Sequence, residues 1–123
     1  MIEGLEDWKT GRLEAVEFQQ LCDRAREIRQ LYAERERERN GRPWTEQEIA
    51  LGFVGDVGDL MKLVQAASGV REIPDAKTKL EHELADCLWS VLVLSDAYGI
   101  DLERAFVGTM DDLERHLAAR AEQ

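Results

Sequence analysis

Apolar residues recur at three- and four-residue spacing along most of this chain, which is the period of amphipathic helices. The pattern predicts a first long helix from about Arg12 to Arg39. Its end, residues 34–39, alternates glutamate and arginine and is typical of a solvated helix terminus. Gly41 and Pro43 should stop the helix, because glycine takes the left-handed cap conformation and proline cannot continue a helix. Residues 1–11 show no clear period, so we expect a peripheral arm there.

A second helix should begin at Thr45, because Thr45-Glu46-Gln47-Glu48 matches the capping-box pattern. It should run to Ser68, with Gly69 as its terminator. Three glycines interrupt it, and each costs roughly 0.5–1 kcal/mol relative to alanine. We expect close helix packing to explain them, with close approach of a ligand as the alternative; they are Gly52, Gly55 and Gly58.

Two further helices follow. Asp75 is the expected N-cap of the third, which should end near Tyr98 with Gly99 as a left-handed cap. Asp101 should cap the fourth, from Leu102 to about Ala119. Short loops favour antiparallel neighbours. The sequence therefore predicts one all-α domain over 1–123, an antiparallel bundle of about four main helices with its motif-bearing core at 45–107.

Composition narrows the function classes. The chain is 44% hydrophobic and 34% charged, with a net charge of −10, which favours a soluble globular protein and argues against binding polymeric nucleic acid. No apolar run reaches membrane-spanning length, and no signal peptide is evident. Cys22 and Cys87 are far apart and are expected as reduced thiols of a cytoplasmic protein. The second and third helices are too apolar for a small monomer to cover, so we expect a homo-oligomer.

The candidate chemistry lies in two pairs of carboxylates, each three residues apart on a helix: Asp56/Asp59 and Glu83/Asp86. Each pair lies close to an apolar helix face, where an ionised carboxylate needs a cation or hydrogen bonds. Side by side, the two helices could present four carboxylates to one Mg²⁺ or Mn²⁺ site. Lys79, one turn before Glu83, could contact phosphate or simply form an ion pair with Glu83.

Such ions would lower the pKa of a bound water and neutralise charge developing on a polyphosphate. One of the four acids, or Glu48 earlier on the second helix, could act as the general base. Trp44 and Trp89 could stack on a base, although packing is the simpler role for each. A third interpretation is that the acids form a polar network with no ligand.

The order of these motifs resembles a known family. Gly55-Asp56-Val57-Gly58-Asp59-Leu60, followed by Glu83-Leu84-Ala85-Asp86, is similar to the paired motif of the MazG-type all-α nucleoside triphosphate pyrophosphohydrolases. The resemblance implies a helical dimer or dimer of dimers, Mg²⁺ dependence, and hydrolysis of a nucleotide to its monophosphate and pyrophosphate. Asp56 and Asp59 stand where that family carries two glutamates.

The leading hypothesis is a metal-dependent nucleotide pyrophosphohydrolase. Asp56, Asp59, Glu83 and Asp86 would hold the metal, with Glu83 and Asp86 catalytic and Lys79 on the phosphates. The alternative is a non-catalytic nucleotide-binding or helical interaction module on the same scaffold.

Overall fold

The computed structural model describes residues 16–121, which form four helices and no strand. The helices are α2 (Phe18–Asn40), α3 (Glu46–Ala67), α4 (Ala76–Ala97) and α5 (Leu102–Ala121). The prediction of an all-α fold with four main helices is therefore confirmed. The arm expected at residues 1–11 lies outside the described residues. None of the four helices combines the length and apolar character needed to cross a bilayer.

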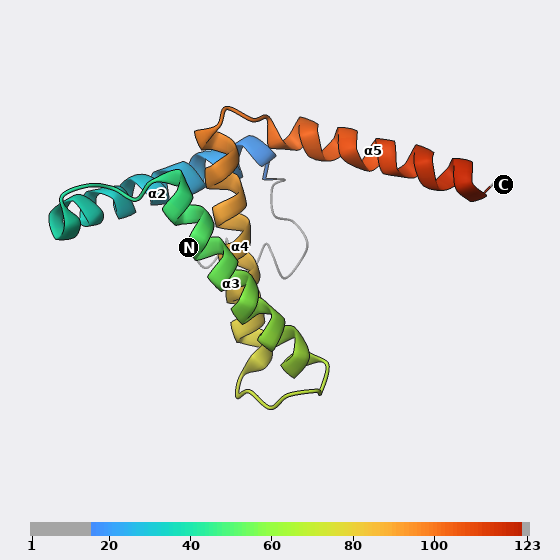
Figure 1. The fold of residues 1–123 in the computed structure, drawn as a ribbon, viewed down its shortest axis with the longest axis horizontal. Helices are drawn as coiled ribbons and strands as arrows, with labels where there is room; N and C mark the ends of the chain where they lie inside the picture. Colours follow the sequence, from blue (N-terminus) through green and yellow to red (C-terminus); the bar gives the residue numbers. More distant parts are fainter. Residues whose placement is uncertain (1–15, 122–123) are drawn as a thin grey trace, which may run out of the picture.

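The helices α3 and α4 lie side by side as a hairpin (Figure 1). The helix α2 crosses α4 near the open end of this hairpin, where α3 begins and α4 ends. The helix α5 extends away from the other three. The core lies where α2 meets the hairpin and is built from Ala25, Ile49, Leu92 and Val93. Two polar contacts tie α2 to α4. The Trp89 indole N–H donates to the Ala25 carbonyl at 3.2 Å, and Arg26 pairs with Asp96 at 2.5 Å.

The helix α3 begins as its sequence predicts. The Glu48 backbone N–H donates to the Thr45 hydroxyl at 3.2 Å, and the Thr45 backbone N–H donates to the Glu48 carboxylate at 3.0 Å. This reciprocal pair satisfies two helix-end donors. It fixes where α3 starts, and therefore which way each later side chain of α3 points.

The predicted glycine caps are also present. Gly41 follows α2 with φ +78°, Gly69 follows α3 with φ +81°, and Gly99 follows α4 with φ +65°. Residues with a Cβ rarely adopt this left-handed conformation. Asp101 caps α5, since its carboxylate accepts the Arg104 backbone N–H at 3.1 Å.

One predicted helix start is wrong, and a second is correct in its position but not in its capping contact. The first long helix begins at Phe18, because Glu17 and Gln20 form a capping box that sets its start, whereas Arg12 lies outside the described residues. Asp75 does occupy the N-cap position of α4, but its backbone is left-handed, with φ +54°, and its side chain makes no cap hydrogen bond.

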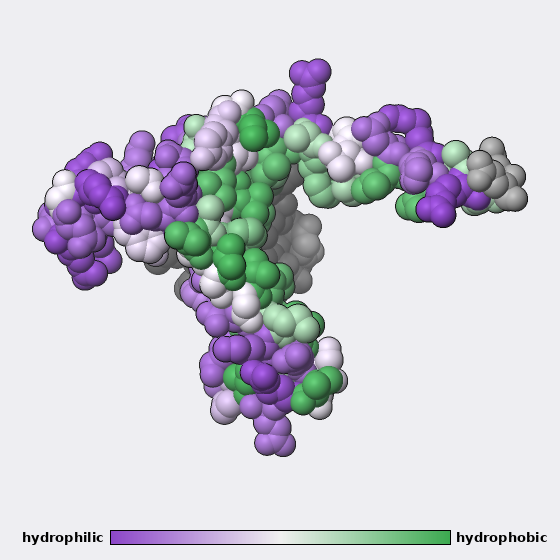
Figure 2. Space-filling view, in the orientation of Figure 1, coloured by the Kyte–Doolittle hydropathy of each residue, from purple (hydrophilic) through white to green (hydrophobic). Residues whose placement is uncertain are grey.

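The expected close packing around the α3 glycines is not found within one chain. A Cβ added at Gly55 or Gly58 would meet no atom of the described residues within 4 Å. Apolar side chains of α3 are exposed beside them, including Leu51, Val54 and Met61. In Figure 2 hydrophobic residues gather over the upper and middle part of the hairpin, and others lie on the lower side of α5. The glycines thus belong to an open apolar face.

Candidate metal centre and its two cavities

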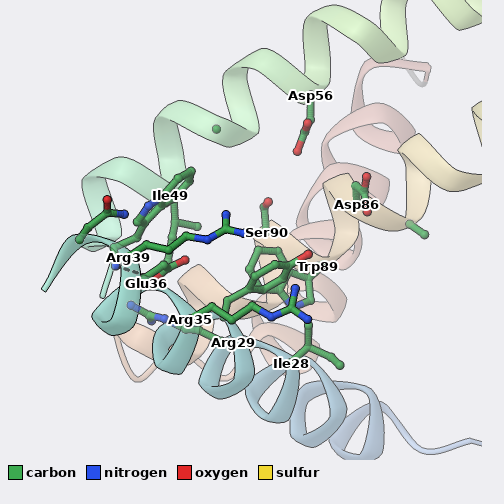
Figure 3. Close-up of a pocket in the computed structure, with 15 residues that line it drawn as sticks. Ile28, Arg29, Arg35, Glu36, Arg39, Ile49, Asp56, Asp86, Trp89 and Ser90 are labelled. Atoms are coloured by element: carbon green, nitrogen blue, oxygen red, sulfur yellow. Dashed lines mark hydrogen bonds between the residues drawn. The ribbon is translucent and has the colours of Figure 1, made fainter. Parts of the chain in front are cut away.

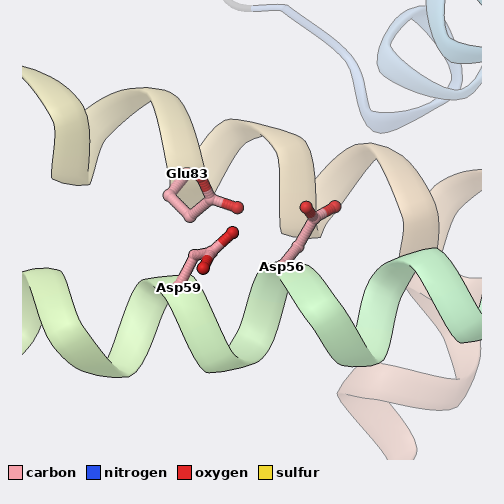
Figure 4. Close-up of side chains that lie close together, drawn as sticks. All are labelled: Asp56, Asp59 and Glu83. Carbon is pink, nitrogen blue, oxygen red and sulfur yellow. The ribbon is translucent and has the colours of Figure 1, made fainter.

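Three carboxylates meet between the hairpin helices. Asp56 and Asp59 come from α3 and Glu83 from α4, and one oxygen of each lies within 4.8 Å of the others. Figure 4 shows the three side chains turned toward one another across the gap between the helices. We call these residues the carboxylate cluster. The sequence predicted this juxtaposition from the two spacings, on the assumption that the two helices pack side by side.

Glu83 is the most constrained member of the cluster. Its Oε1 atom is buried and has no hydrogen-bond partner among the described residues. Burial raises the pKa of the Glu83 carboxyl above its ordinary value, and the neighbouring Asp56, Asp86 and Asp59 carboxylates raise it further. A carboxylate so placed favours either a proton or a cation. A divalent cation would satisfy the buried oxygen and remove the mutual repulsion.

Asp86 does not join the cluster. Its Oδ2 atom lies 3.2 Å from Nε2 of His82, one helical turn earlier. Positions three apart on a helix differ by about 60° around its axis, so Glu83 and Asp86 point in different directions. The structure thus brings together three of the four predicted metal ligands and leaves the fourth beside them.

Lys79 lies on one side of the cluster. It lines a cavity of about 560 Å³ together with Asp59, Glu83, His82 and Lys62, which we call the lysine cavity. No ion pair between Lys79 and Glu83 is present in the described residues. Lys62 was missed by the sequence reasoning, although it follows Asp59 by three residues and so shares its helix face. The cavity therefore offers two ammonium groups beside two carboxylates.

Glu48, the candidate general base, is placed elsewhere. It lies two helical turns before Asp56, where its carboxylate completes the α3 capping box and pairs with Arg42 at 2.6 Å. The Arg42 guanidinium, followed by the Thr45 backbone N–H, lowers the Glu48 pKa to about 2. A carboxylate this acidic is a weak proton acceptor near neutral pH. The position and the chemistry of Glu48 both argue against the role of base.

A second cavity of about 560 Å³ opens on the other side of the cluster. Asp56 and Asp86 lie at one end of it, and arginines of α2 lie at the other (Figure 3). Trp89 and Tyr32 form part of its wall, with ring centroids 5.6 Å apart in an edge-on contact. We call it the arginine cavity; its charged α2 side chains are Arg29, Arg35, Glu36 and Arg39.

The arginine cavity adds a feature that the sequence interpretation lacked. Residues 34–39 were expected to form a solvated helix end, and all of them except the half-buried Glu36 are exposed. Three of their side chains also line the cavity. Arg35 and Arg39 are four residues apart and so share a face of α2. That spacing was visible in the sequence, but the crossing of α2 over the hairpin was not.

Comparison with models of protein families identifies the family of this chain. The model of the MazG nucleotide pyrophosphohydrolase domain matches residues 45–117, which is more than half of the chain and includes every member of the carboxylate cluster. The protein belongs to this family. Neither the curated proteins nor the solved structures contain a match to the chain.

Proposed function

We propose that this protein is a metal-dependent nucleoside triphosphate pyrophosphohydrolase, which cleaves its substrate to a nucleoside monophosphate and pyrophosphate. The observation that carries the proposal is the buried, unpartnered oxygen of Glu83 facing Asp56 and Asp59. Membership of the MazG family supports the reaction class.

The carboxylate cluster fits a hard divalent cation. Mg²⁺ and Mn²⁺ prefer oxygen ligands, and Asp56, Asp59 and Glu83 supply carboxylate oxygens close together. When bound, the ion would lower the pKa of water and offset the charge of the polyphosphate.

The side chains around the cluster have separate tasks in this proposal. Lys62 and Lys79 bind phosphate oxygens from the lysine cavity as point charges. Asp86 lies outside the cluster and accepts the proton of the attacking water, while its contact with His82 orients the carboxylate. Glu83 would hold the metal together with Asp56 and Asp59.

Pyrophosphate release from a panel of nucleoside triphosphates, with and without Mg²⁺ or Mn²⁺, tests the reaction. Wild-type protein should release pyrophosphate only with metal, and Glu83→Gln should lower turnover at least about 100-fold because it removes a charged metal ligand. Glu81→Gln, an exposed position on the same helix, is the matched control. Equal turnover by wild type and Glu83→Gln would refute the site.

A non-catalytic nucleotide-binding module is the second candidate. It is favoured by the shorter Asp56 and Asp59 side chains and by the separation of Asp86 from the cluster. Metal-dependent nucleotide binding without any pyrophosphate release from wild-type protein would select it.

We also propose that the protein is a homodimer or a dimer of dimers. Phe106 of α5 is 60% exposed, and other apolar residues on α5 are exposed as well: Met110, Leu113 and Leu117. A helix with such a face needs a partner surface, and α5 extends away from the hairpin (Figure 1). Light scattering should give a multiple of the 14.1 kDa chain mass; the mass of a single chain would contradict this.

A cytoplasmic location is part of the same proposal. Cys22 and Cys87 are both free thiols. The pKa of the Cys87 thiol is raised, mainly by burial, which keeps the thiol protonated and inert. Free, unreactive thiols are typical of reducing compartments.

A further inference from the structure

The two cavities suggest how the substrate is oriented, and this step rests on the proposed function. The reaction divides a nucleoside triphosphate into a small, highly charged half and a large half with a flat base. The lysine cavity has two ammonium groups and no Phe, Tyr or Trp side chain in its lining, which suits pyrophosphate. The arginine cavity has three aromatic side chains and a volume in the range of small-molecule sites, which suits a nucleoside.

Trp44 is placed to stack on the base. Its ring contacts α3 at Gly52, where an added Cβ would lie 3.6 Å from the ring. Gly52 is four residues before Asp56, which is about 6 Å along the helix axis. The Trp44 side chain is held on one side and is still 44% exposed. A base stacked there would have room for its sugar before the carboxylate cluster.

Trp89 has a different role from Trp44. Its indole N–H is bonded to Ala25 and its ring meets Tyr32 edge-on. These contacts fix Trp89 as a wall of the cavity. The expectation that both tryptophans pack therefore holds for Trp89, whereas Trp44 remains 44% exposed.

The α2 end of the arginine cavity carries both hydrogen-bond donors and a hydrogen-bond acceptor. Neither Arg35 nor Arg39 forms an ion pair within residues 16–121, in contrast to Arg29, which lies 3.4 Å from Glu46. Glu36 accepts the Trp44 backbone N–H at 2.8 Å through Oε1, so its Oε2 atom can accept another bond. The end of the cavity thus combines guanidinium donors with a carboxylate acceptor.

We propose that this end selects a 6-oxopurine, with guanine as the best fit. Guanine presents O6 and N7 as adjacent acceptors, which an arginine binds in bidentate fashion. Its N1–H and N2 amino group can donate hydrogen bonds to the Glu36 carboxylate. Adenine places an amino donor where guanine has O6, so it would face the arginines with the wrong polarity. Arg35 and Arg39 are therefore the specificity-determining residues, and Trp44 is the stacking residue.

Calorimetric titration of the full-length protein with guanosine, inosine and adenosine monophosphates tests the proposal without requiring turnover. Wild-type protein should bind GMP at least about tenfold more tightly than AMP, the discrimination expected for one bidentate pair. IMP should fall between them, because it keeps O6 and N7 but lacks the N2 amino group. Equal binding of GMP and AMP, or tighter binding of AMP, would overturn the proposal.

The variants separate stacking from edge recognition. Arg35→Ala and Arg39→Ala should together abolish the preference for GMP, while Arg37→Ala, an exposed arginine of the same helix outside the cavity, should keep it. Trp44→Ala should weaken GMP and AMP alike, at least about fivefold, through lost stacking. An unchanged GMP to AMP ratio in the double arginine variant would overturn the assignment. Selective GMP binding without pyrophosphate release would refute the proposed reaction and leave this inference standing.

Discussion

The lysine cavity and the arginine cavity both border the carboxylate cluster, but they are built from different helices. The lysine cavity is built from the α3–α4 hairpin and its connecting loop, so all its residues lie between Asp59 and Glu83 in the chain. The arginine cavity needs α2, whose residues are far from α4 in sequence. In the proposed function, the local hairpin would supply the groups for phosphate chemistry, and a distant helix would supply groups that contact the rest of the ligand. The proposal therefore predicts that reaction and specificity can change separately in this fold.

The largest expected effect comes from the residues that divide the cavities. Asp56 lines the arginine cavity and Asp59 the lysine cavity, yet both belong to the cluster. Asp56→Asn and Asp59→Asn should each lower turnover at least about 100-fold, since either change removes a metal-ligand charge. Pyrophosphate release checks this, with Asp111→Asn on the exposed part of α5 as the control. A strong effect from only one aspartate would show that the cluster does not act as a unit.

A smaller effect should distinguish the cavities from each other. Lys79→Ala should lower kcat/KM about tenfold for every nucleoside triphosphate, because the phosphates common to all substrates lose one charge contact. Lys77→Ala, an exposed lysine near the same helix start that lines neither cavity, is the matched control. A change in base preference in Lys79→Ala would contradict the division between the cavities.

The smallest effect should come from Glu48, which lies outside both cavities. Glu48→Gln keeps a side chain that can complete the capping box but loses the Arg42 ion pair. Because the folded-state pKa is lowered from 4.5 to about 2, the lost stabilisation is present above pH 4.5 and disappears as the pH falls toward 2. Thermal unfolding at several pH values should show a small difference that vanishes in acid.

Turnover of Glu48→Gln should stay within about twofold of wild type, because a residue in a helix cap takes no part in proton transfer. A loss comparable to that of Asp59→Asn would restore Glu48 as the general base. A stability difference independent of pH would show that the Arg42 pair is not its source.

The sequence predicted the hairpin well for a physical reason. Capping boxes, glycine caps and three-residue spacings are local, so Thr45, Gly69 and the Asp56/Asp59 pair could be interpreted without knowing the tertiary structure. The meeting of Asp59 with Glu83 needed only one further assumption, that adjacent helices with a short loop pack antiparallel.

What the sequence did not reveal depends on how distant elements cross. The role proposed for Arg35 and Arg39 depends on α2 lying over the hairpin, whereas residues 34–39 alone have the pattern of a solvated helix end. Asp86 was assigned to the metal site because it shares a stripe with Glu83, but the rotation between them turns it toward His82. The direction of α5 follows the Gly99 turn and is likewise not encoded in helical periodicity.

The most direct test of the central claim is a calorimetric Mn²⁺ titration of wild-type protein and Glu83→Gln, without nucleotide. We predict saturable binding to wild type, accompanied by a rise in melting temperature as expected for a ligand bound only by the folded state. Glu83→Gln should bind at least about 100-fold more weakly and show no such rise. If both proteins bind Mn²⁺ equally, or neither binds it, the carboxylate cluster is not the metal centre.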